Sequence, residues 1–393
     1  MSHDVDLKSI AVAGGIVGGP FGSSLGGKDY VSHGVPVVRG TNLGAGKYIG
    51  GDYVYVTNEK VESDLSRNTA MHGDVVFTQR GTLGQVALVP KSTVERYVIS
   101  QSQMRLRVEP AIASAEYVYY ACGDSKFVQQ VRDNAISTGV PHINLGILSR
   151  LRIPLPDLPQ QRAIAEVLGA LDDKIAANTK LVSTIDAIAQ TMFKSIEAES
   201  SLLPLSETAD FVNGKAFTKG ASGTGRVVVR IAELNSGIGG STVYSDADVE
   251  DKHVSRAGDI LFAWSGSLTL HRWYRDDAIV NQHIFKVIPK VGYPSWLVYE
   301  LIRAKLDAFK SIAADKATTM GHIQRHHLDA TVPVPRPEDI ARIGAAMDGL
   351  WQRALAAERE SLTLAEMREA LLPELMSGRL RVKDAEKKVE EVV

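Results

Sequence analysis

Residues 158–196 read LPQQRAIAEVLGALDDKIAANTKLVSTIDAIAQTMFKSI. Apolar side chains recur here in alternating steps of four and three residues, and one polar residue, Asn178, falls within the series. This spacing keeps a single apolar stripe on one side of a helix, as in a coiled coil. With a rise of about 1.5 Å per residue, the stretch would form a helix roughly 60 Å long.

A long helix with one apolar stripe needs a partner that covers the stripe. The same spacing returns in residues 336–380, so we expect the two helices to pair, with Asn178 fixing their register. The residues predicted to make this pairing are Ile164, Leu168, Leu171, Ile175, Asn178, Val182, Ile185, Ile343, Met347, Leu350, Leu364 and Leu371.

The sequence before each helix is a repeat of the other. VPVVRGTNL (35–43) resembles RVVVRIAEL (226–234), GDVVFTQRGTLG (73–84) resembles GDILFAWSGSLT (258–269), and HIN (142–144) resembles HIQ (322–324). The β-branched and aromatic runs predict strands, and 115–135 has helical spacing. Repetition at this scale indicates one structural unit written twice.

The predicted fold class is therefore α+β. We expect two tandem mixed α/β domains, 1–155 and 201–335, each followed by a long helix, 156–200 and 336–380. The helices would pair as an antiparallel coiled coil, which permits pseudo-twofold symmetry. The charged tail, 381–393, is expected to be disordered.

Composition favours an ordinary soluble protein. Of the 393 residues, 44% are hydrophobic and 23% charged, and the formal charge of −2 argues against a strongly basic nucleic-acid binder. The single cysteine, Cys122, excludes an internal disulfide and a cysteine-built metal site. No apolar run is long enough to cross a bilayer, and no secretory leader is evident, so we expect a cytoplasmic protein with no membrane partner.

Three stretches resemble parts of enzyme sites, and each is incomplete. Gly22–Asp29 has the spacing of a phosphate-binding loop, but Asp29 replaces the hydroxyl residue that holds Mg²⁺. His322, His326 and His327 lack the further ligands of a metal site. Asp172-Asp173-Lys174 resembles half a nuclease site, but a solvated helix face explains it. We therefore predict no catalytic, cofactor or metal site.

Polar side chains gather at the turns of both blocks, where Gln79, Arg80 and Thr82 correspond to Trp264, Ser265 and Ser267. Arginine and glutamine can form paired hydrogen bonds with guanine and adenine edges. Ordinary solvated hairpin tips explain the same residues equally well. Lys28, Lys47, Lys215 and Lys219 lie on glycine-flanked loops, where they could meet phosphates or could simply be exposed.

Taken together, these stretches resemble the specificity subunits of type I restriction–modification systems. LPQQRAIAEVLGALDDKIAAN (158–178), PLSETADFVNGKAF (204–217), VVRGTNL, GDVVFTQRGTLG and LLPELMSGRLRV (371–382) carry the resemblance, which covers nearly the whole chain. It implies a non-catalytic DNA-recognition subunit in which each block is a target-recognition domain that reads one half of a split sequence.

The same resemblance implies that the helices dock two modification (methyltransferase) subunits, and that motor–nuclease restriction subunits join the full complex. S-adenosylmethionine, ATP and Mg²⁺ would bind those partners, and no cofactor would bind this chain. The conserved helices would dock partners through the pairing residues and through Gln161 and Arg162. In the second helix, Ile340 and Ala341 stand at the positions of that pair.

By this reading the residues expected to contact double-stranded DNA come from the turns and loops of both blocks. They are Lys28, Arg39, Gln79, Arg80, Thr82, Gln101, His142, Asn144, Lys215, Lys219, Arg230, Ser265, Ser267, Gln282, His322 and Gln324. Two other classes of function compete with this one: a coiled-coil scaffold that binds proteins, and a self-sufficient nuclease or methyltransferase.

Overall fold

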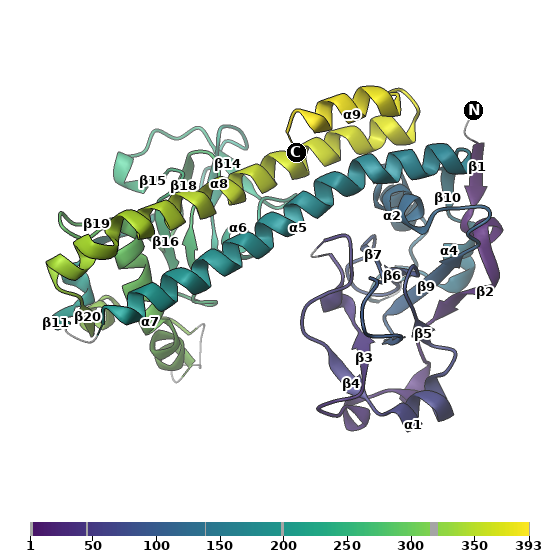
Figure 1. Ribbon diagram of the computed structural model, residues 1–393, viewed down its shortest axis with the longest axis horizontal. Coiled ribbons are helices and arrows are strands. Elements are labelled where there is room, and N and C mark those ends of the chain that lie inside the picture. The colour runs from purple at the N-terminus through teal and green to yellow at the C-terminus, as the bar shows by residue number, and fades with distance from the viewer. Residues whose placement is uncertain (1–2, 45, 138, 198–199, 315–320, 393) are drawn as a thin grey trace. The chain divides into compact units, whose positions relative to one another are not determined.

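The computed structural model describes residues 3–44, 46–137, 139–197, 200–314 and 321–392. The chain divides into two compact units, Met1–Ala176 with Leu364–Val393, and Ala177–Thr363. Two long helices, α5 (Leu158–Ser195) and α8 (Pro337–Met376), contribute one end to each unit. Each unit therefore combines one sheet-containing block with a segment of the helix pair (Figure 1).

The first unit contains two four-stranded sheets and a two-stranded pair. The first sheet has the order β2 (Ala11–Gly18), β9 (Gln103–Val108), β6 (Val75–Thr78) and β7 (Val86–Leu88). The second has the order β4 (Val54–Val56), β3 (Val35–Val38), β8 (Tyr97–Ile99) and β5 (Thr69–Ala70). The pair is β1 (His3–Asp6) with β10 (Arg152–Leu155), and the short helices are α1 (Asn58–Lys60), α2 (Ala115–Gly123), α3 (Ser125–Asp133) and α4 (Leu145–Arg150).

The second unit has the same sheet topology. Its sheets have the orders β12 (Ala209–Asn213), β19 (Ile284–Pro289), β16 (Ile260–Ala263), β17 (Leu270–Arg272), and β14 (Val243–Ser245), β13 (Arg226–Val229), β18 (Ala278–Val280), β15 (Val254–Ser255). Its pair is β11 (Ser201–Pro204) with β20 (Thr331–Val334), and its other helices are α6 (Ile231–Ser236) and α7 (Ser295–Ala314). The matching strand orders confirm the duplication predicted from the repeated motifs.

The register also matches between the two copies. In the first unit β3 pairs with β8 in parallel and with β4 antiparallel, and β13 pairs with β18 and β14 in the same way. The central strands carry apolar runs such as VVFT and ILFA, whose residues are all buried. Such runs are typical of strands covered on both faces. Sequence therefore determines these strands locally.

The long helices begin and end where the local sequence indicates. At the start of α5, the Asp157 carboxylate accepts a hydrogen bond from the Gln160 amide at 2.9 Å, which satisfies one free N–H of the first turn. After α8, Gly378 adopts φ +72°, a left-handed conformation that favours glycine after a helix.

Within each unit, α5 and α8 run antiparallel and side by side (Figure 1). In the first unit, the Arg368 guanidinium donates a hydrogen bond to the Asp172 carboxylate. In the second, the side-chain amide of Asn178 donates to the Glu360 carboxylate at 2.8 Å. Residues predicted for the stripe are buried or half-buried in these contacts. The predicted antiparallel pairing is confirmed.

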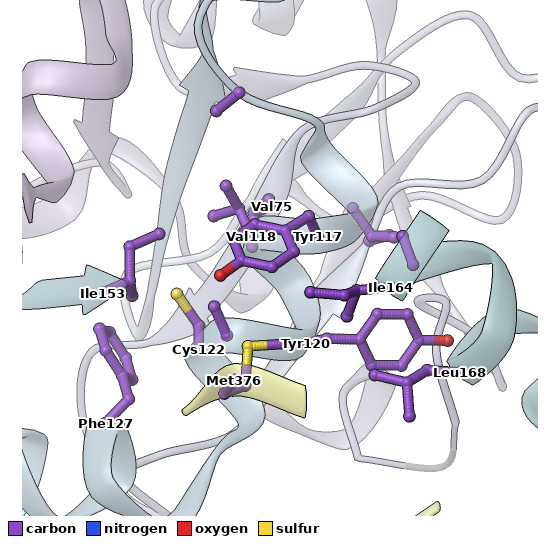
Figure 2. Close-up of a cluster of buried hydrophobic side chains, with 14 of the residues drawn as sticks. Val75, Tyr117, Val118, Tyr120, Cys122, Phe127, Ile153, Ile164, Leu168 and Met376 are labelled. Carbon is purple, nitrogen blue, oxygen red and sulfur yellow. The ribbon is translucent and has the colours of Figure 1, made fainter. Parts of the chain in front are cut away.

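The core of the first unit joins the sheet, α2 and both long helices. Figure 2 shows Tyr120 of α2 reaching toward Leu168 of α5, with Met376 of α8 beside Cys122. Leu168 and Cys122 are at most 1% exposed. The block and the helices of this unit therefore share one continuous apolar core.

The expectation of a disordered tail is wrong. Residues Val382–Glu390 form helix α9, and Ala385 and Val389 are buried against the core of the first unit. The tail is strongly charged, but its buried residues Ala385 and Val389 lie four apart and so fall on one helix face.

Candidate nucleic-acid interface

In the first unit, four chain segments meet at one end of the β2–β9–β6–β7 sheet. The Gln79 amide, just after β6, donates to the Ser102 carbonyl at 2.7 Å, and the Ile143 amide donates to the Gln79 carbonyl at 3.0 Å. The Gly19 amide donates to the Gln103 carbonyl at 2.9 Å. These backbone bonds bring the loop after β2, the β6 turn, the start of β9 and the 142–144 segment together.

A close backbone approach explains Gly19. A Cβ atom there would lie 1.9 Å from the Ser100 carbonyl oxygen, so no other residue fits without displacement. Close to Gly19 in space, the side-chain amide nitrogen of Gln101 donates to the Gly22 carbonyl at 2.6 Å and to the Leu25 carbonyl at 3.2 Å. The loop that carries Lys28 is therefore tied to the strand end. Gln101, predicted to contact DNA, holds this loop.

The second unit repeats the same set of backbone hydrogen bonds. The Trp264 amide donates to the His283 carbonyl and the Ile323 amide to the Trp264 carbonyl, each at 3.0 Å. The Gly214 amide donates to the Ile284 carbonyl at 3.0 Å, and a Cβ on Gly214 would lie 2.1 Å from the Asn281 carbonyl oxygen. Both units thus use the same backbone arrangement to present four segments at one sheet end.

Most of the residues predicted to contact DNA lie in or beside these segments. Those with exposed side chains are Lys28, Arg80, Thr82, Gln101, Asn144, Lys215, Lys219, Ser267, Gln282 and Gln324. Those half-buried are Arg39, Gln79, His142, Arg230 and His322. The backbones of Arg80 and His142 pair in an isolated bridge, as do those of Ser265 and His322. Ser265 is only 5% exposed, so its side chain is poorly placed to reach a ligand.

Several predicted contacts have structural partners. The Asn144 side chain accepts from the Ile147 amide at 2.8 Å and so caps α4. The Arg230 guanidinium pairs with the Glu233 carboxylate, and the hydrogen bonds that it donates to this carboxylate raise the pKa of Arg230. Lys215 lies 3.2 Å from the Glu250 carboxylate, an exposed ion pair of little strength.

The sequence allows Lys47 either a phosphate contact or simple exposure, and the structure instead buries it. Lys47 is 8% exposed, and its ammonium lies 3.9 Å from the Glu116 carboxylate and 5.9 Å from the centre of the Tyr120 ring. A Cβ on Gly169 would come within 3.4 Å of the same ammonium. Lys47 therefore packs against α5, and the small size of Gly169 leaves room for it.

The two residues predicted to dock partners have different environments. Gln161 is 1% exposed; its side chain accepts from the Ser114 amide at 2.9 Å and donates to the Pro156 carbonyl at 2.8 Å. The Gln161 side chain therefore holds α5 to the start of α2, and its docking role stays a prediction. Arg162 is exposed and remains a docking candidate.

The sequence did not reveal the polar contacts that join each block to the helices. In the first unit the Tyr120 hydroxyl donates to the Asp172 carboxylate at 2.7 Å, and Asp172 also pairs with Arg368. In the second unit Arg272 makes two hydrogen bonds to Glu358 at 2.9 and 3.1 Å. Asp172, which resembled part of a nuclease site, is used in this junction. No local signal marks such pairs, because the partners are far apart in sequence.

Within the described ranges, no group of three or more His, Cys, Asp or Glu residues is arranged to hold a metal ion. Across those same residues, every helix is too short or too polar to traverse a lipid bilayer.

Known proteins with related sequences or folds are specificity subunits. Residues 38–187 match the family model of the type I restriction modification DNA specificity domain. The chain is 22% identical over 432 aligned residues to the type I restriction enzyme MjaIX specificity subunit of Methanocaldococcus jannaschii, covering 97% of this chain and 94% of that one. It is 24% identical over 143 residues to the HindI specificity subunit of Haemophilus influenzae, covering 36% of this chain and 31% of that one.

The fold is also similar to the crystal structure of the type I restriction–modification S subunit from M. genitalium. The TM-score is 0.56 at 15% identity, over 95% of this chain and 96% of that one. Residues 38–187 therefore resemble the type I restriction–modification specificity domain, and the proteins to which the whole chain is similar are specificity subunits of such systems.

Proposed function

We propose that this chain is a type I restriction–modification specificity subunit that reads a bipartite DNA sequence, with one block for each half-site. The observation that carries the proposal is the set of backbone hydrogen bonds that recurs at the sheet end of each unit. In it, Gln79 and Trp264 occupy equivalent backbone positions in two copies of one fold. Two recognition surfaces in one chain raise each other's effective concentration at a split target.

The surface around Gln79 has the chemistry for this role. Arg80, Thr82 and Gln101 are exposed there. At base edges in the major groove, arginine donates hydrogen bonds, and glutamine both donates and accepts them. In the second unit Gln282 and Gln324 are exposed at the equivalent surface. Lys219, also exposed, belongs to the segment that follows Gly214 in the chain. Base-edge contacts would come from the turns, and lysines would contact phosphates.

We also propose that the long helices dock two modification subunits and that restriction subunits join in the full complex. The methyl donor, ATP and Mg²⁺ would then be bound by those partners, in the cytoplasm where the DNA lies. Arg162 is the exposed member of the predicted docking pair, while Gln161 holds the fold. Arg162→Ala should weaken complex assembly and leave the thermal unfolding of the free chain unchanged, as size-exclusion chromatography and calorimetry would measure.

The continuous helices would set the unread spacer between the half-sites. α5 and α8 run without a break for 38 and 40 residues. Adding one heptad to both helices keeps the apolar stripe in register. Methylated sites should then carry a longer spacer, and an unchanged spacer would count against this part of the proposal.

Binding by the reconstituted complex tests the function. The chain is assembled with its modification subunits, and affinity for target and non-target duplexes is measured from low to high salt. Specific binding should weaken steeply with salt because phosphate contacts release counterions. Binding that ignores DNA sequence and salt would favour the protein-binding scaffold instead.

Arg80→Ala and Lys91→Ala provide a matched pair. Both residues are exposed cations of the first unit, and β6 and β7 pair so that Arg80 follows one end of the strand pair and Lys91 the opposite end. Arg80→Ala should weaken target binding roughly 5- to 100-fold, the range for a lost base contact. Lys91→Ala should leave it unchanged; equal effects would contradict the assigned surface.

A further inference from the structure

A hollow of about 370 Å³ opens at the sheet end of the second unit. It is lined by Asn213, Trp264, Phe285, His322, Ile323, Gln324 and Arg325. We call it the Trp264 hollow. It lies on the surface proposed to face DNA, because the Ile323 amide donates a hydrogen bond to the Trp264 carbonyl in the set of backbone bonds that both units share.

The wall of the Trp264 hollow is mainly hydrocarbon. The indole N–H of Trp264 donates to the Asn213 side-chain oxygen at 2.8 Å, so its one polar group is already used. The Trp264 and Phe285 rings lie 5.8 Å apart, and Phe285 and Ile323 are 6% and 2% exposed. The ring of Trp264 is therefore held in place and presents carbon rather than a hydrogen-bond donor.

The equivalent position in the first unit has the opposite chemistry. Gln79 stands where Trp264 stands, and Gly18, which has no side chain, stands where Asn213 holds the indole. Gln79 can donate and accept hydrogen bonds, whereas Trp264 with its N–H occupied does neither. The two blocks thus present different chemistry on one backbone frame.

Exposed polar and cationic groups accompany the apolar wall. Gln324 and Arg325 are exposed, and the Gln282 amide bonds to the carbonyl of Lys215, whose side chain is also exposed. Phosphates would meet these cations while the hollow meets a base. In the major groove of DNA, the only apolar group on an unmodified base is the C5-methyl group of thymine.

We propose that the Trp264 hollow receives a thymine methyl group, so that the second block recognises a T·A pair by apolar contact. The inference rests on the proposed function and specifies what one of its two surfaces reads. The first block, with Gln79 at the same position, reads its base by hydrogen bonds and makes no such methyl contact there.

Replacing thymine by uracil tests the proposal, because it removes the methyl group and keeps base pairing. The target is first mapped from methylated sites, and each thymine of both half-sites is then replaced singly in duplexes bound to the reconstituted complex. One thymine in the second block's half-site should show a loss of about fourfold, the effect of one buried methyl group. The proposal is overturned if that half-site lacks a T·A pair or if no replacement there weakens binding.

Trp264→Gln, which installs the residue of the first block, supplies the matched variant. Its complex should bind thymine and uracil duplexes equally at the sensitive position, while Gln79→Ala should keep the discrimination. Retained discrimination in Trp264→Gln overturns the proposal. Emission from Trp273, Trp296 and Trp351, each at most 8% exposed, reports whether the variant is folded. If it is not folded, the uracil scan of the unmodified protein decides alone.

The proposed bipartite function and the thymine-methyl contact can be contradicted separately. A complex that binds its target specifically but ignores every thymine methyl overturns this inference and leaves the bipartite function intact. A complex that shows no sequence preference overturns the proposed function and this inference with it.

Discussion

The two units use the same fold but join their blocks to the helices by different polar contacts. In the first, Tyr120 of α2 and Arg368 of α8 meet on Asp172 of α5. In the second, Arg272 of β17 makes two hydrogen bonds to Glu358 of α8 and lies 4.7 Å from the centre of the Trp351 ring. Trp351 occupies the position of Asp172 in the repeat, 179 residues on, so the duplication kept the packing and replaced the charges.

The comparison shows where each junction depends on charge. The Arg272 side chain is 4% exposed, whereas the Arg368 side chain is 26% exposed. Burial alone would lower the pKa of Arg272, but the hydrogen bonds and charge of Glu358 outweigh it and raise the pKa. The second junction therefore has more to lose when one partner is removed. The two units also carry separate reporters: all four tryptophans lie in the second unit, and the single cysteine, Cys122, lies in the first.

The largest expected effect is from Glu358→Ala. It leaves a buried guanidinium whose remaining acid, Asp186, is 3.9 Å away, and an uncompensated buried charge costs about 3–5 kcal/mol. Tryptophan emission in urea should show the second unit unfolding at lower denaturant. Asp348→Ala, an exposed acid on the same helix, is the control and should change little. Equal midpoints for the two variants would contradict the assigned role of Glu358.

Asp172→Ala should have a smaller effect, confined to the first unit. The variant leaves the Tyr120 hydroxyl and Arg368 without their carboxylate, and Arg368 can still reach water, so we expect a loss of about 2–3 kcal/mol. Burial raises the pKa of the Cys122 thiol, so thiol reagents should react only when the unit opens. Labelling should accelerate in Asp172→Ala but not in the exposed neighbour control, Asp173→Ala; identical rates would refute the junction.

Asn178→Leu should change stability by less than about 1 kcal/mol, and in the stabilising direction, since an apolar residue replaces a polar one in the stripe. Asn178 is 4% exposed and bonds to Glu360, while its counterpart in the second helix is Ala357. The variant should still bind DNA, with a looser preference for spacer length if Asn178 fixes the register. A lower melting temperature would show that the Asn178–Glu360 bond is a net stabilising contact.

The smallest expected effect is a pH dependence specific to the second unit. Burial lowers the pKa of His253 and of His271 below the ordinary 6.5. Both histidines bind a proton less readily in the folded protein than in the unfolded chain, so stability is lost as pH falls below about 6.5. Tryptophan emission in urea at pH 7.5 and 5.5 would measure the loss.

The double variant His253→Phe, His271→Phe is the comparison for this pH effect. Burial raises the pKa of Glu300 and Glu358 in the same unit, so only the difference between the protein and the variant isolates the histidines. The variant should lose less stability between the two pH values. An equal loss in both proteins would rule the histidines out as the cause.

Sequence predicted the features that repeat or have a short period. The apolar stripe of α5 and the duplicated motifs are visible along the chain, and the structure confirms the helix pairing and the matching sheets. Contacts between distant residues were not predictable. Gln161 turns inward to accept a hydrogen bond from the backbone amide of Ser114, which lies 47 residues earlier in the chain. Asp172 binds Arg368, which lies 196 residues later.

The candidate site was predicted only in part, for the same reason. Gln79, Arg80 and Trp264 could be picked out at turns, but nothing local showed that Asn213, 51 residues away, binds the indole N–H. Ser265 and Lys47 resembled exposed polar residues, and folding buries both. The charged tail was misjudged because its order comes from tertiary packing of Ala385 and Val389 rather than from helix propensity.

A genome-wide map of methylated bases tests the central claim that each unit reads one half of a split target. The map is compared among cells that carry the unmodified chain, Arg80→Ala in the first unit, or Gln324→Ala in the second. We predict a bipartite motif in which each variant relaxes the sequence of a different half and leaves the other half and the spacer unchanged. A continuous motif, or two variants that alter the same half, would contradict the account.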